Sequence, residues 1–228
     1  MKKIDVIILS YAKNDEIINM NNNCINSILN STTNYKFNIF LIETDSTKEF
    51  EYPQENVKVI QPGLEFNYNK FLNIGLKECK SDWILISNND TIYHKGFIER
   101  MFDIYNFNNE ILSMSPMDDD WKWHTNFDRN IDFFYGYRTS FEVAGWSILI
   151  NKSVFEKIGE FDEQFSFWYQ DNDYANSLIK NNIKHALVTN SKVTHLVSKS
   201  HDLIDQEKIF EMTGGLFSAF KNKWLKNK

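Results

Sequence analysis

The sequence lacks most of the features that assign a protein to a class at a glance. Its 228 residues include only two cysteines, Cys24 and Cys79, and these do not have the spacing of a metal-binding or redox motif. We therefore expect a reduced, cytoplasmic protein. The net charge of −6 provides no basic field that would attract nucleic acid. No stretch approaches the roughly 20 apolar residues that a membrane-spanning helix requires.

Two phosphate-binding loops are also missing from the sequence. It contains neither Gly-x-Gly-x-x-Gly nor Gly-x-x-x-x-Gly-Lys-Ser/Thr, which argues against dinucleotide-dependent redox enzymes and P-loop phosphoryl transfer. The apolar run at residues 4–9 is short, contains Asp5 and precedes no small-residue cleavage site, so we do not expect a signal peptide. No linker rich in proline, glycine or serine divides the chain, and its length suits one domain.

The first ninety residues alternate between apolar runs and amphipathic segments. We predict strands at residues 4–10, 37–42, 57–60 and 83–87, and helices at residues 15–30 and 67–79. This alternation predicts βαβ units with right-handed crossovers, and therefore an α/β fold with a doubly wound, mostly parallel sheet. We expect residues 1–92 to form a nucleotide-binding half.

The pattern changes after residue 93. We predict helices near residues 95–107, at 153–158 and at 173–180, a strand at 143–150, and extended segments at 186–188 and 192–195. Residues 115–141 have weak periodicity and many aromatic side chains, which is typical of a long functional loop or a mixed-sheet excursion. Residues 93–205 are therefore expected to form a smaller, mixed or antiparallel portion on the acceptor side.

The C-terminal residues 206–228 carry apolar side chains at helical spacing, interleaved with lysines. The apolar residues are Leu216, Phe217, Phe220, Trp224 and Leu225, and the lysines are Lys221, Lys223, Lys226 and Lys228. The pattern predicts an amphipathic helix with two alternative roles. It either packs on the domain with its lysines in water, or lies on an anionic membrane surface, which would make this a peripheral protein at the inner face of a membrane.

Three acidic residues follow apolar or aromatic runs that are typical of strands: Glu43, Asp90 and Asp171. In a doubly wound sheet, the carboxyl ends of parallel strands meet at one edge, where α/β proteins bind their ligands. We therefore expect the three carboxylates to converge on one rim.

Asp90 is the candidate metal ligand, because a carboxylate suits Mg²⁺ or Mn²⁺ bound together with a substrate diphosphate. Asn88 and Asn89 beside it add oxygen and amide groups without further charge. The alternative is an Asn-rich turn that caps the next helix.

Asp171 follows Phe165, Phe167, Trp168 and Tyr169. Aromatic surroundings raise the proton affinity of a carboxyl, which suits a general base. Asp173, two residues later, is an alternative cap for the helix that follows.

His195 ends the last predicted strand and is either a metal ligand or a structural hydrogen-bonding group. The acidic run Asp118-Asp119-Asp120 is a competing metal site, although a charge run in an irregular segment is usually only solvated.

Four stretches in chain order carry a resemblance to a known family. They are residues 6–11, residues 42–47, residues 73–91, and residues 145–195 with Gly145-Trp146, Gly159-Glu160-Phe161-Asp162-Glu163, Gln170-Asp171-Asn172-Asp173 and Val193-Thr194-His195. On these stretches the chain, from Ile4 to about Ser200, resembles the inverting glycosyltransferases of family 2, especially the rhamnosyltransferase-like members. The resemblance implies one GT-A domain over residues 1–205, followed by the C-terminal helix.

The resemblance also implies a role for each matching residue. Ser10 and Tyr11 would contact the nucleotide of a UDP- or dTDP-sugar, and Glu43 would meet its base. Lys70, Asn73 and Asn89 would lie near the diphosphate, with Asp90 and His195 on Mn²⁺ or Mg²⁺. Asp171 would deprotonate the acceptor hydroxyl. The acceptor contacts are not carried over from the family: we expect them from the aromatic segment 115–141, from Trp146 and from Trp168. That acceptor would be a glycan, a lipid-linked sugar or another hydroxyl compound, as in polysaccharide biosynthesis.

Three positions depart from the family's pattern. Asn88-Asn89-Asp90 replaces the usual Asp-x-Asp, Gln170 replaces the glutamate that commonly precedes the catalytic acid, and Leu72 replaces an arginine whose diphosphate contact Lys70 would have to supply. These changes bear on metal binding more than on the reaction class. Two other functions stay open from the residues, namely a nucleotidyltransferase and a non-catalytic module that binds nucleotides or carbohydrates.

Overall fold

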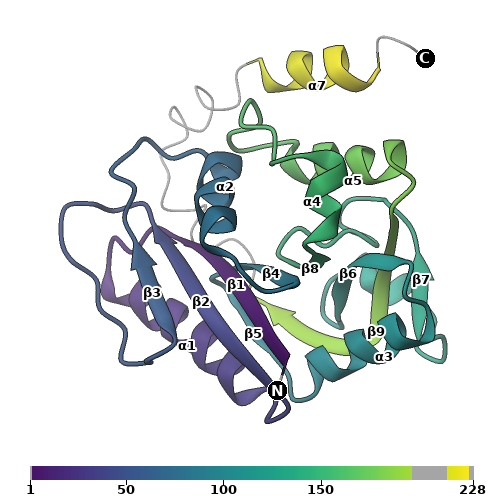
Figure 1. Cartoon of the computed structure of the whole chain (residues 1–228), viewed down its shortest axis with the longest axis horizontal. Helices are drawn as coiled ribbons and strands as arrows, with labels where there is room; N and C mark the ends of the chain where they lie inside the picture. The colour runs from purple at the N-terminus through teal and green to yellow at the C-terminus, as the bar shows by residue number, and fades with distance from the viewer. Residues whose placement is uncertain (1, 197–214, 226–228) are drawn as a thin grey trace.

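The computed structural model describes residues 2–196 and 215–225. These residues form three layers, in which a nine-stranded sheet lies between two layers of helices (Figure 1). The sheet is buried because helices cover both faces, and this burial explains why its central strands are apolar along nearly their whole length.

The first four strands run parallel: β1 (Lys2–Ser10), β2 (Tyr35–Glu43), β3 (Val57–Ile60) and β4 (Trp83–Asn88). In the register of these strands, Ser10 lies opposite Glu43 and Leu9 lies opposite Asn88. The carboxyl ends of β1, β2 and β4 therefore meet at one edge of the sheet.

The rest of the sheet is mixed. It contains β5 (Thr91–Tyr93), β6 (Ile111–Asp118), β7 (Phe133–Tyr135), β8 (Ser147–Asn151) and β9 (Lys184–His195). The strand order is β3-β2-β1-β4-β8-β6-β9-β5, and β7 pairs with β9 off this path. Because β8 is antiparallel to both β4 and β6, and β9 is parallel to β6, only β5, β7 and β8 run against the common direction. The sheet is therefore mixed but mostly parallel, as predicted.

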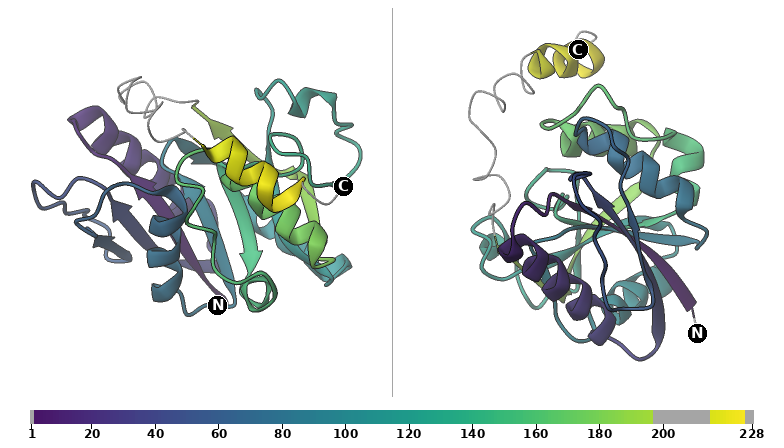
Figure 2. Two further views of the ribbon diagram at one scale, coloured as in Figure 1. Left: turned by 90° about the horizontal axis from the view of Figure 1, so that it is seen from above. Right: turned by 90° about the vertical axis from the view of Figure 1, so that its left-hand side faces the viewer.

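Helices pack on both faces. α1 (Asp15–Asn30) and α3 (Phe97–Phe107) cover one face, where their apolar side chains contact Val6 and Ile8 of β1. α2 (Tyr68–Glu78), α4 (Ser153–Ile158) and α5 (Gln170–Lys180) cover the opposite face, where Ile7 points. The short 3-10 helix η1 (His124–Asn126) lies in the segment between β6 and β7. α7 (Leu216–Trp224) lies outside this second layer, above α4 and α5 (Figure 2).

The predicted elements of the first ninety residues are confirmed, and Val57–Ile60 and Ser153–Ile158 match their observed bounds. Of the two alternatives for residues 115–141, the mixed-sheet excursion is confirmed, because residues 115–118 belong to β6 and residues 133–135 form β7, with irregular chain between them. β5 was not predicted, and the two extended segments near the end of the domain form one continuous strand, β9. β8 begins at Ser147 rather than at residue 143.

The prediction for the last helix of the domain was also wrong at its start. α5 begins at Gln170, three residues before the predicted position, so Asp171 lies in its first turn and not at the end of a strand. The aromatic run before it is an irregular segment, whose Ser166 carbonyl accepts a hydrogen bond from Tyr68 N at 2.8 Å. The predicted C-terminal helix is described only over Leu216–Trp224; residues 206–214 and 226–228 lie outside the described residues.

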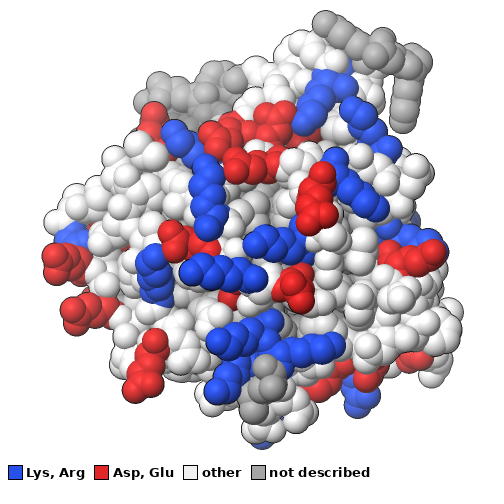
Figure 3. All heavy atoms as spheres, viewed as in Figure 1, with Lys and Arg blue, Asp and Glu red and all other residues white. Residues whose placement is uncertain are grey.

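Among the described residues, no helix is both long and apolar enough to cross a membrane. Acidic and basic side chains are interspersed over most of the face in Figure 3, with one group of basic side chains near the N-terminus.

One close approach between α2 and β1 makes a testable prediction about packing. A Cβ atom added to Gly75 would lie 2.7 Å from Cγ2 of Ile7, which is fully buried. We expect Gly75→Ala to lower the free energy of unfolding by about 1–3 kcal/mol through overpacking. In the Ile7→Ala background the added methyl group has space, so the two changes should cost less together than their separate costs summed.

Ile8→Ala is the matched control, because Ile8 is also fully buried but faces α1 and α3. Its cost in urea denaturation should add to that of Gly75→Ala. If the unfolding free-energy cost of Gly75→Ala added fully to that of Ile7→Ala, as it should to that of Ile8→Ala, the proposed contact between Gly75 and Ile7 would be contradicted.

Candidate functional site

Two of the three predicted acids lie at the carboxyl edge of the parallel strands. Glu43 is the last residue of β2, and Asp90 lies in the tight turn between β4 and β5. Asp171 reaches the same region from the first turn of α5. The sequence predicted it at the end of a strand, so its region was predicted correctly and its local structure was not.

Glu43 is fully buried, and one of its carboxylate oxygens is held by the backbone. Oε1 accepts hydrogen bonds from Ala12 N at 3.0 Å and from Asp45 N at 2.9 Å. Oε2 is buried and has no hydrogen-bond partner in the part of the chain that the structure describes. A buried carboxylate oxygen without a partner is costly, so this atom is available to accept a hydrogen bond from a ligand N–H group.

Ser10 and Asn89 are joined by a third side chain, Asn21 of α1. Asn21 Nδ2 donates to Ser10 Oγ at 2.7 Å, and Asn89 Nδ2 donates to Asn21 Oδ1 at 2.8 Å. All three side chains are buried. This network fixes the end of β1 against the turn that carries Asp90, which is a structural contribution that the sequence did not reveal.

Asp90 and His195 are brought together by strand pairing. β5 pairs antiparallel with β9, which puts Thr91 opposite His195, and Leu196 N donates to the Asp90 carbonyl at 2.8 Å. As a result, His195 Nε2 lies 3.2 Å from Asp90 Oδ1. The two side chains are nearly buried.

Aromatic stacking, rather than hydrogen bonding, holds the His195 ring. The ring lies parallel to that of Trp146, with centroids 4.9 Å apart and planes 6° apart, and Trp121 contacts it at 6.3 Å. The backbone N–H of His195 donates to Asp118 Oδ2 at 2.9 Å. Trp146 is only 6% exposed, so the structure places this predicted acceptor residue behind His195.

The residues of this pair fit a divalent cation. Asp90 Oδ1 and both ring nitrogens of His195 are buried and have no partner in hydrogen-bond geometry among residues 2–196 and 215–225. Two ligand atoms on one ion, each about 2.1 Å from it, lie roughly 3.0–3.4 Å apart, which matches the observed separation. Within residues 2–196 and 215–225 no third histidine, cysteine or acidic side chain joins the pair. Such a small protein ligand set is typical of Mg²⁺ or Mn²⁺ bound largely through phosphate oxygens.

The acidic run at residues 118–120 does not form the competing metal site. Asp118 is buried and accepts hydrogen bonds from the backbone N–H groups of Asp120 and His195. Asp119 is paired with Lys192 at 2.6 Å and with Arg129 at 3.1 Å. Asp118 therefore supports the backbone of His195, and Asp119 forms ordinary surface ion pairs.

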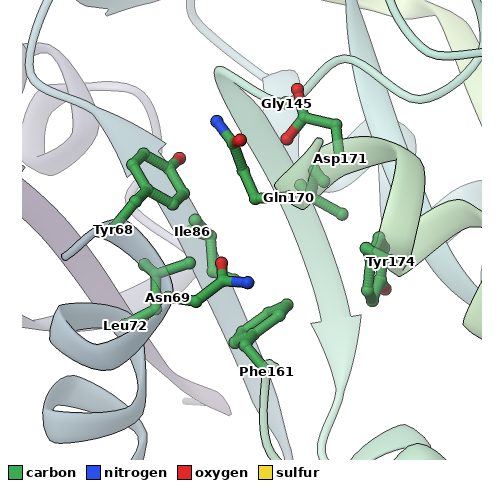
Figure 4. A pocket seen from close by; sticks show the side chains of 10 residues that line it. Tyr68, Asn69, Leu72, Ile86, Gly145, Phe161, Gln170, Asp171 and Tyr174 are labelled. Carbon is green, nitrogen blue, oxygen red and sulfur yellow. The ribbon is translucent and has the colours of Figure 1, made fainter. Parts of the chain in front are cut away.

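Asp171 lines a pocket between α2, β4, β8 and α5 that is half open to solvent (Figure 4). Its lining residues are Tyr68, Asn69, Leu72, Ile86, Gly145, Ile148, Phe161, Gln170, Asp171 and Tyr174. A Cβ atom at Gly145 would lie 2.1 Å from Asp171 Oδ2. The carboxylate therefore occupies space that any other residue at position 145 would fill.

Burial raises the pKa of Asp171 from 3.8 to about 6. The carboxyl is surrounded largely by apolar and aromatic side chains, which solvate its charged form poorly. A carboxyl with this pKa is mostly ionised at neutral pH yet holds a proton more readily than an exposed aspartate. This is the property expected of a general base.

Tyr68 is a site residue that the sequence reasoning missed. It is the first residue of α2 after the cap Asn67, and its hydroxyl lies 3.4 Å from Asn88 Oδ1. Burial, followed by the charges of Asp171 and Asp90, raises the pKa of Tyr68 well above its usual value. Its phenol therefore stays protonated between the two acids. The only sequence signal was the Asn67 cap, which marks where α2 begins.

The predicted residues on α2 differ in their accessibility. Lys70 is half-buried in the first turn. Asn73 is buried, and its amide group bonds Phe161 twice, accepting from its N–H and donating to its carbonyl, both at 2.9 Å. Asn73 thus fastens the segment that leads to α5.

The remaining predicted contacts lie nearer the surface. Tyr11 is half-buried, with the Lys13 ammonium 4.5 Å from the centre of its ring. Trp168 is 46% exposed at the irregular segment before α5. Of the two predicted acceptor residues, Trp168 is the one that a substrate in solution can reach.

Comparison with known proteins agrees with this geometry. The family model described as Glycosyl transferase family 2 matches residues 5–165, which is more than two thirds of the chain. No curated protein sequence matches the chain. The matched region includes Glu43 and Asp90 and ends before Asp171, His195 and α7.

The raised pKa of Asp171 predicts a stabilising substitution. Above about pH 6 the folded protein holds a buried charge, whereas the unfolded chain ionises this group near 3.8. Asp171→Asn removes that cost and should increase the free energy of unfolding at pH 7–8 by at most about 3 kcal/mol. The gain should shrink as the pH falls through 6 and vanish below about 4, where both states are protonated. Thermal melts of both proteins between pH 4 and 8 would measure it, and an unchanged or lower melting temperature at pH 8 would contradict it.

Proposed function

The chain belongs to glycosyl transferase family 2, and from this we propose that it is an inverting enzyme that moves a sugar from a UDP- or dTDP-sugar to an acceptor hydroxyl. Glycosyltransferase activity is the activity of the family. The choice of donor, the inverting mechanism and the roles of individual residues are our proposal. The observation that carries it is the Asp171 carboxyl, half-buried in a pocket near the edge that holds Asp90 and with its pKa raised by desolvation to about 6.

In this proposal Asp171 accepts the proton of the acceptor hydroxyl as its oxygen attacks the anomeric carbon. The bond from that carbon to the diphosphate oxygen breaks as the new glycosidic bond forms, so attack from the opposite face inverts the configuration. The phenol of Tyr68, held protonated near both Asp171 and Asp90, is a donor that suits a developing negative charge.

The nucleotide is proposed to lie along the ends of β1 and β2. Glu43 Oε2, buried and without a partner, suits an N–H group of the base. Tyr11 directly follows the end of β1 and is the proposed aromatic contact for the nucleotide. Lys70 at the start of α2 is a candidate for a diphosphate contact. Ser10, Asn73 and Asn89 are engaged in protein hydrogen bonds, so we assign them to shaping the site.

Asp90 and His195 are the residues that would hold Mn²⁺ or Mg²⁺. When bound, such an ion neutralises the charge that develops on the departing nucleoside diphosphate. Trp146 keeps the His195 ring in place by stacking on it, and we assign it to this role instead of to acceptor binding. Trp168, exposed beside the pocket, remains the proposed acceptor contact.

Substituting Asp171 tests the base. Asp171→Asn keeps the shape of the side chain but removes its proton affinity, so the turnover number should fall by about 10²- to 10⁴-fold. Binding of UDP- or dTDP-sugar, measured by calorimetry, should stay within about twofold of wild type, because the donor site is unchanged. Wild-type turnover should rise with pH through about 6 as the carboxyl ionises. Near-normal turnover in Asp171→Asn would remove the base assignment and favour a role for the protein in binding alone.

Substituting Asp90 and His195 tests the cation. In the presence of Mn²⁺, Asp90→Ala and His195→Ala should each weaken binding of UDP or dTDP by about tenfold or more, because a lost ligand typically costs that much in metal-assisted affinity. Without Mn²⁺ the variants and wild type should bind alike. Asp119→Ala is the matched control, because this nearby acid is half-exposed and forms only ion pairs. Equal losses with and without Mn²⁺ would rule against a metal role.

A further inference from the structure

The helix α7 lies on the segment that leads to Asp171. In two orthogonal views it covers the outer side of α5 and the irregular segment of residues 161–169, which we call the approach segment (Figure 2). The family model ends at residue 165, so α7 lies beyond the part of the chain that the family defines. Its contacts therefore need an explanation from this chain alone.

Two adjacent side chains of α7 bind the first turn of α5. Lys223 Nζ lies 2.7 Å from Asp173 Oδ1 and 2.7 Å from Asp162 Oδ2. Trp224 Nε1 donates to the same Asp173 oxygen at 2.7 Å. The Asp173 side chain is only 7% exposed, whereas the Lys223 and Asp162 side chains are 31% and 29% exposed, so the carboxylate of Asp173 is the part of this cluster that is removed from water. Removing Lys223 would leave the charge of the buried Asp173 carboxylate without this partner, which gives the Lys223–Asp173 contact more weight than a fully exposed ion pair has.

Aromatic contacts from α7 hold the residue just before α5. The ring of Phe220 stacks on that of Tyr169, with centroids 5.1 Å apart and planes at 24° to each other. The centroid of the Phe217 ring lies 6.0 Å from that of Tyr169. Phe220 also contacts Phe165 edge-on at 6.3 Å. Tyr169 thus packs against two rings of α7.

Tyr169 has a backbone conformation that needs such support. Its φ of 67° lies in the left-handed region, which bulky residues rarely adopt. The Tyr169 carbonyl accepts the first hydrogen bond of α5, from Asp173 N at 2.8 Å. Asp171 lies between these two residues, both of which α7 contacts. Its direction into the pocket therefore depends on how Tyr169 and Asp173 are held.

The opposite side of the approach segment is fixed to α2. Asn73 and Asn69 donate to the carbonyls of Phe161 and Asp162 at 2.9 and 2.8 Å, and Asn67 donates to the Glu163 carbonyl at 2.8 Å. These bonds hold the beginning of the segment, whereas α7 holds its end. A nine-residue helix is marginal in isolation, so α7 and the approach segment stabilise each other.

We propose that α7 is a strap that positions the general base, with Lys223, Trp224 and Phe220 as positioning residues for Asp171. The inference rests on the proposed function, because it takes Asp171 to be the base. The strap acts on catalysis without touching substrate: its removal leaves the donor site at the edge of β1, β2 and β4 intact and lets the first turn of α5 move.

The test compares Lys223→Met with three other variants. Lys223→Met should lower the turnover number about 10- to 100-fold while the KM for the nucleotide sugar stays within about twofold, since small misplacements of a catalytic group have effects of this size. Lys223→Arg, which keeps the charge, should restore turnover to within about threefold of wild type. Trp224→Phe, which keeps the ring but loses the N–H group, should show a smaller loss. Lys221→Met is the matched control on the same helix, has no ion pair in the described part of the chain, and should behave as wild type.

Hydrogen exchange provides a readout that does not depend on turnover. Amides of residues 161–175 should exchange faster in Lys223→Met than in Lys221→Met, whereas those of β1, β2 and β4 should not change. Faster exchange with turnover still within twofold of wild type would overturn the positioning role. Unchanged exchange in Lys223→Met would overturn the strap itself.

The two proposals fail in distinguishable ways. A wild-type protein that transfers no sugar from any UDP- or dTDP-sugar would remove the proposed function, and with it the catalytic meaning of the strap. Normal wild-type turnover together with full activity of Lys223→Met would support the proposed glycosyltransferase function and reject only the positioning role of α7.

Discussion

The antiparallel pairing of β5 with the end of β9 is the contact on which the site depends. It spans about a hundred residues of sequence and joins the last strand of the sheet to the turn that carries Asp90. Without it, the position of His195 relative to Asp90 would not be fixed, because none of the described residues makes a hydrogen bond to either ring nitrogen. The Trp146 stack and the Asp118 carboxylate then fix the ring and backbone of the histidine in turn. Two residues distant in sequence so become one polar pair.

The parallel part of the sheet was predictable because its signals are local. Residues 4–10 and 83–87 are continuously apolar, and α1 begins at a cap, Asn14, whose side chain accepts from Ile17 N. β5 and β6 were not predictable in this way. β5 has three residues and exists through its pairing with β9, while β6 contains Pro116 and ends in acids, and it becomes a strand only between β8 and β9.

Site residues that lie at the ends of parallel strands could be predicted from the sequence. Those whose position depends on tertiary packing could not. Glu43 and Asp90 lie at the edge expected from the parallel sheet. Asp171 was placed in the correct region with the wrong local structure, because an aromatic run resembles a strand until α2 and α7 hold it as an irregular segment. Tyr68 went unnoticed, since nothing local distinguishes a tyrosine in the first turn of a helix. The burial of Trp146 depends on His195 and Trp121, which are far from it in sequence.

Gly145 shows how narrowly fold and activity are separated at one position. Its missing side chain is the space that the Asp171 carboxylate fills, although the backbone there needs no left-handed conformation. A single added methyl group would compete with the Asp171 carboxylate, the base in our proposal, for the same volume, and its nearest neighbours would be atoms of Asp171 rather than of the apolar clusters that hold the sheet to its two helical layers. If Asp171 is the base, a larger residue at this position would therefore mark a chain that keeps the fold and loses the reaction, recognisable from one letter of its sequence.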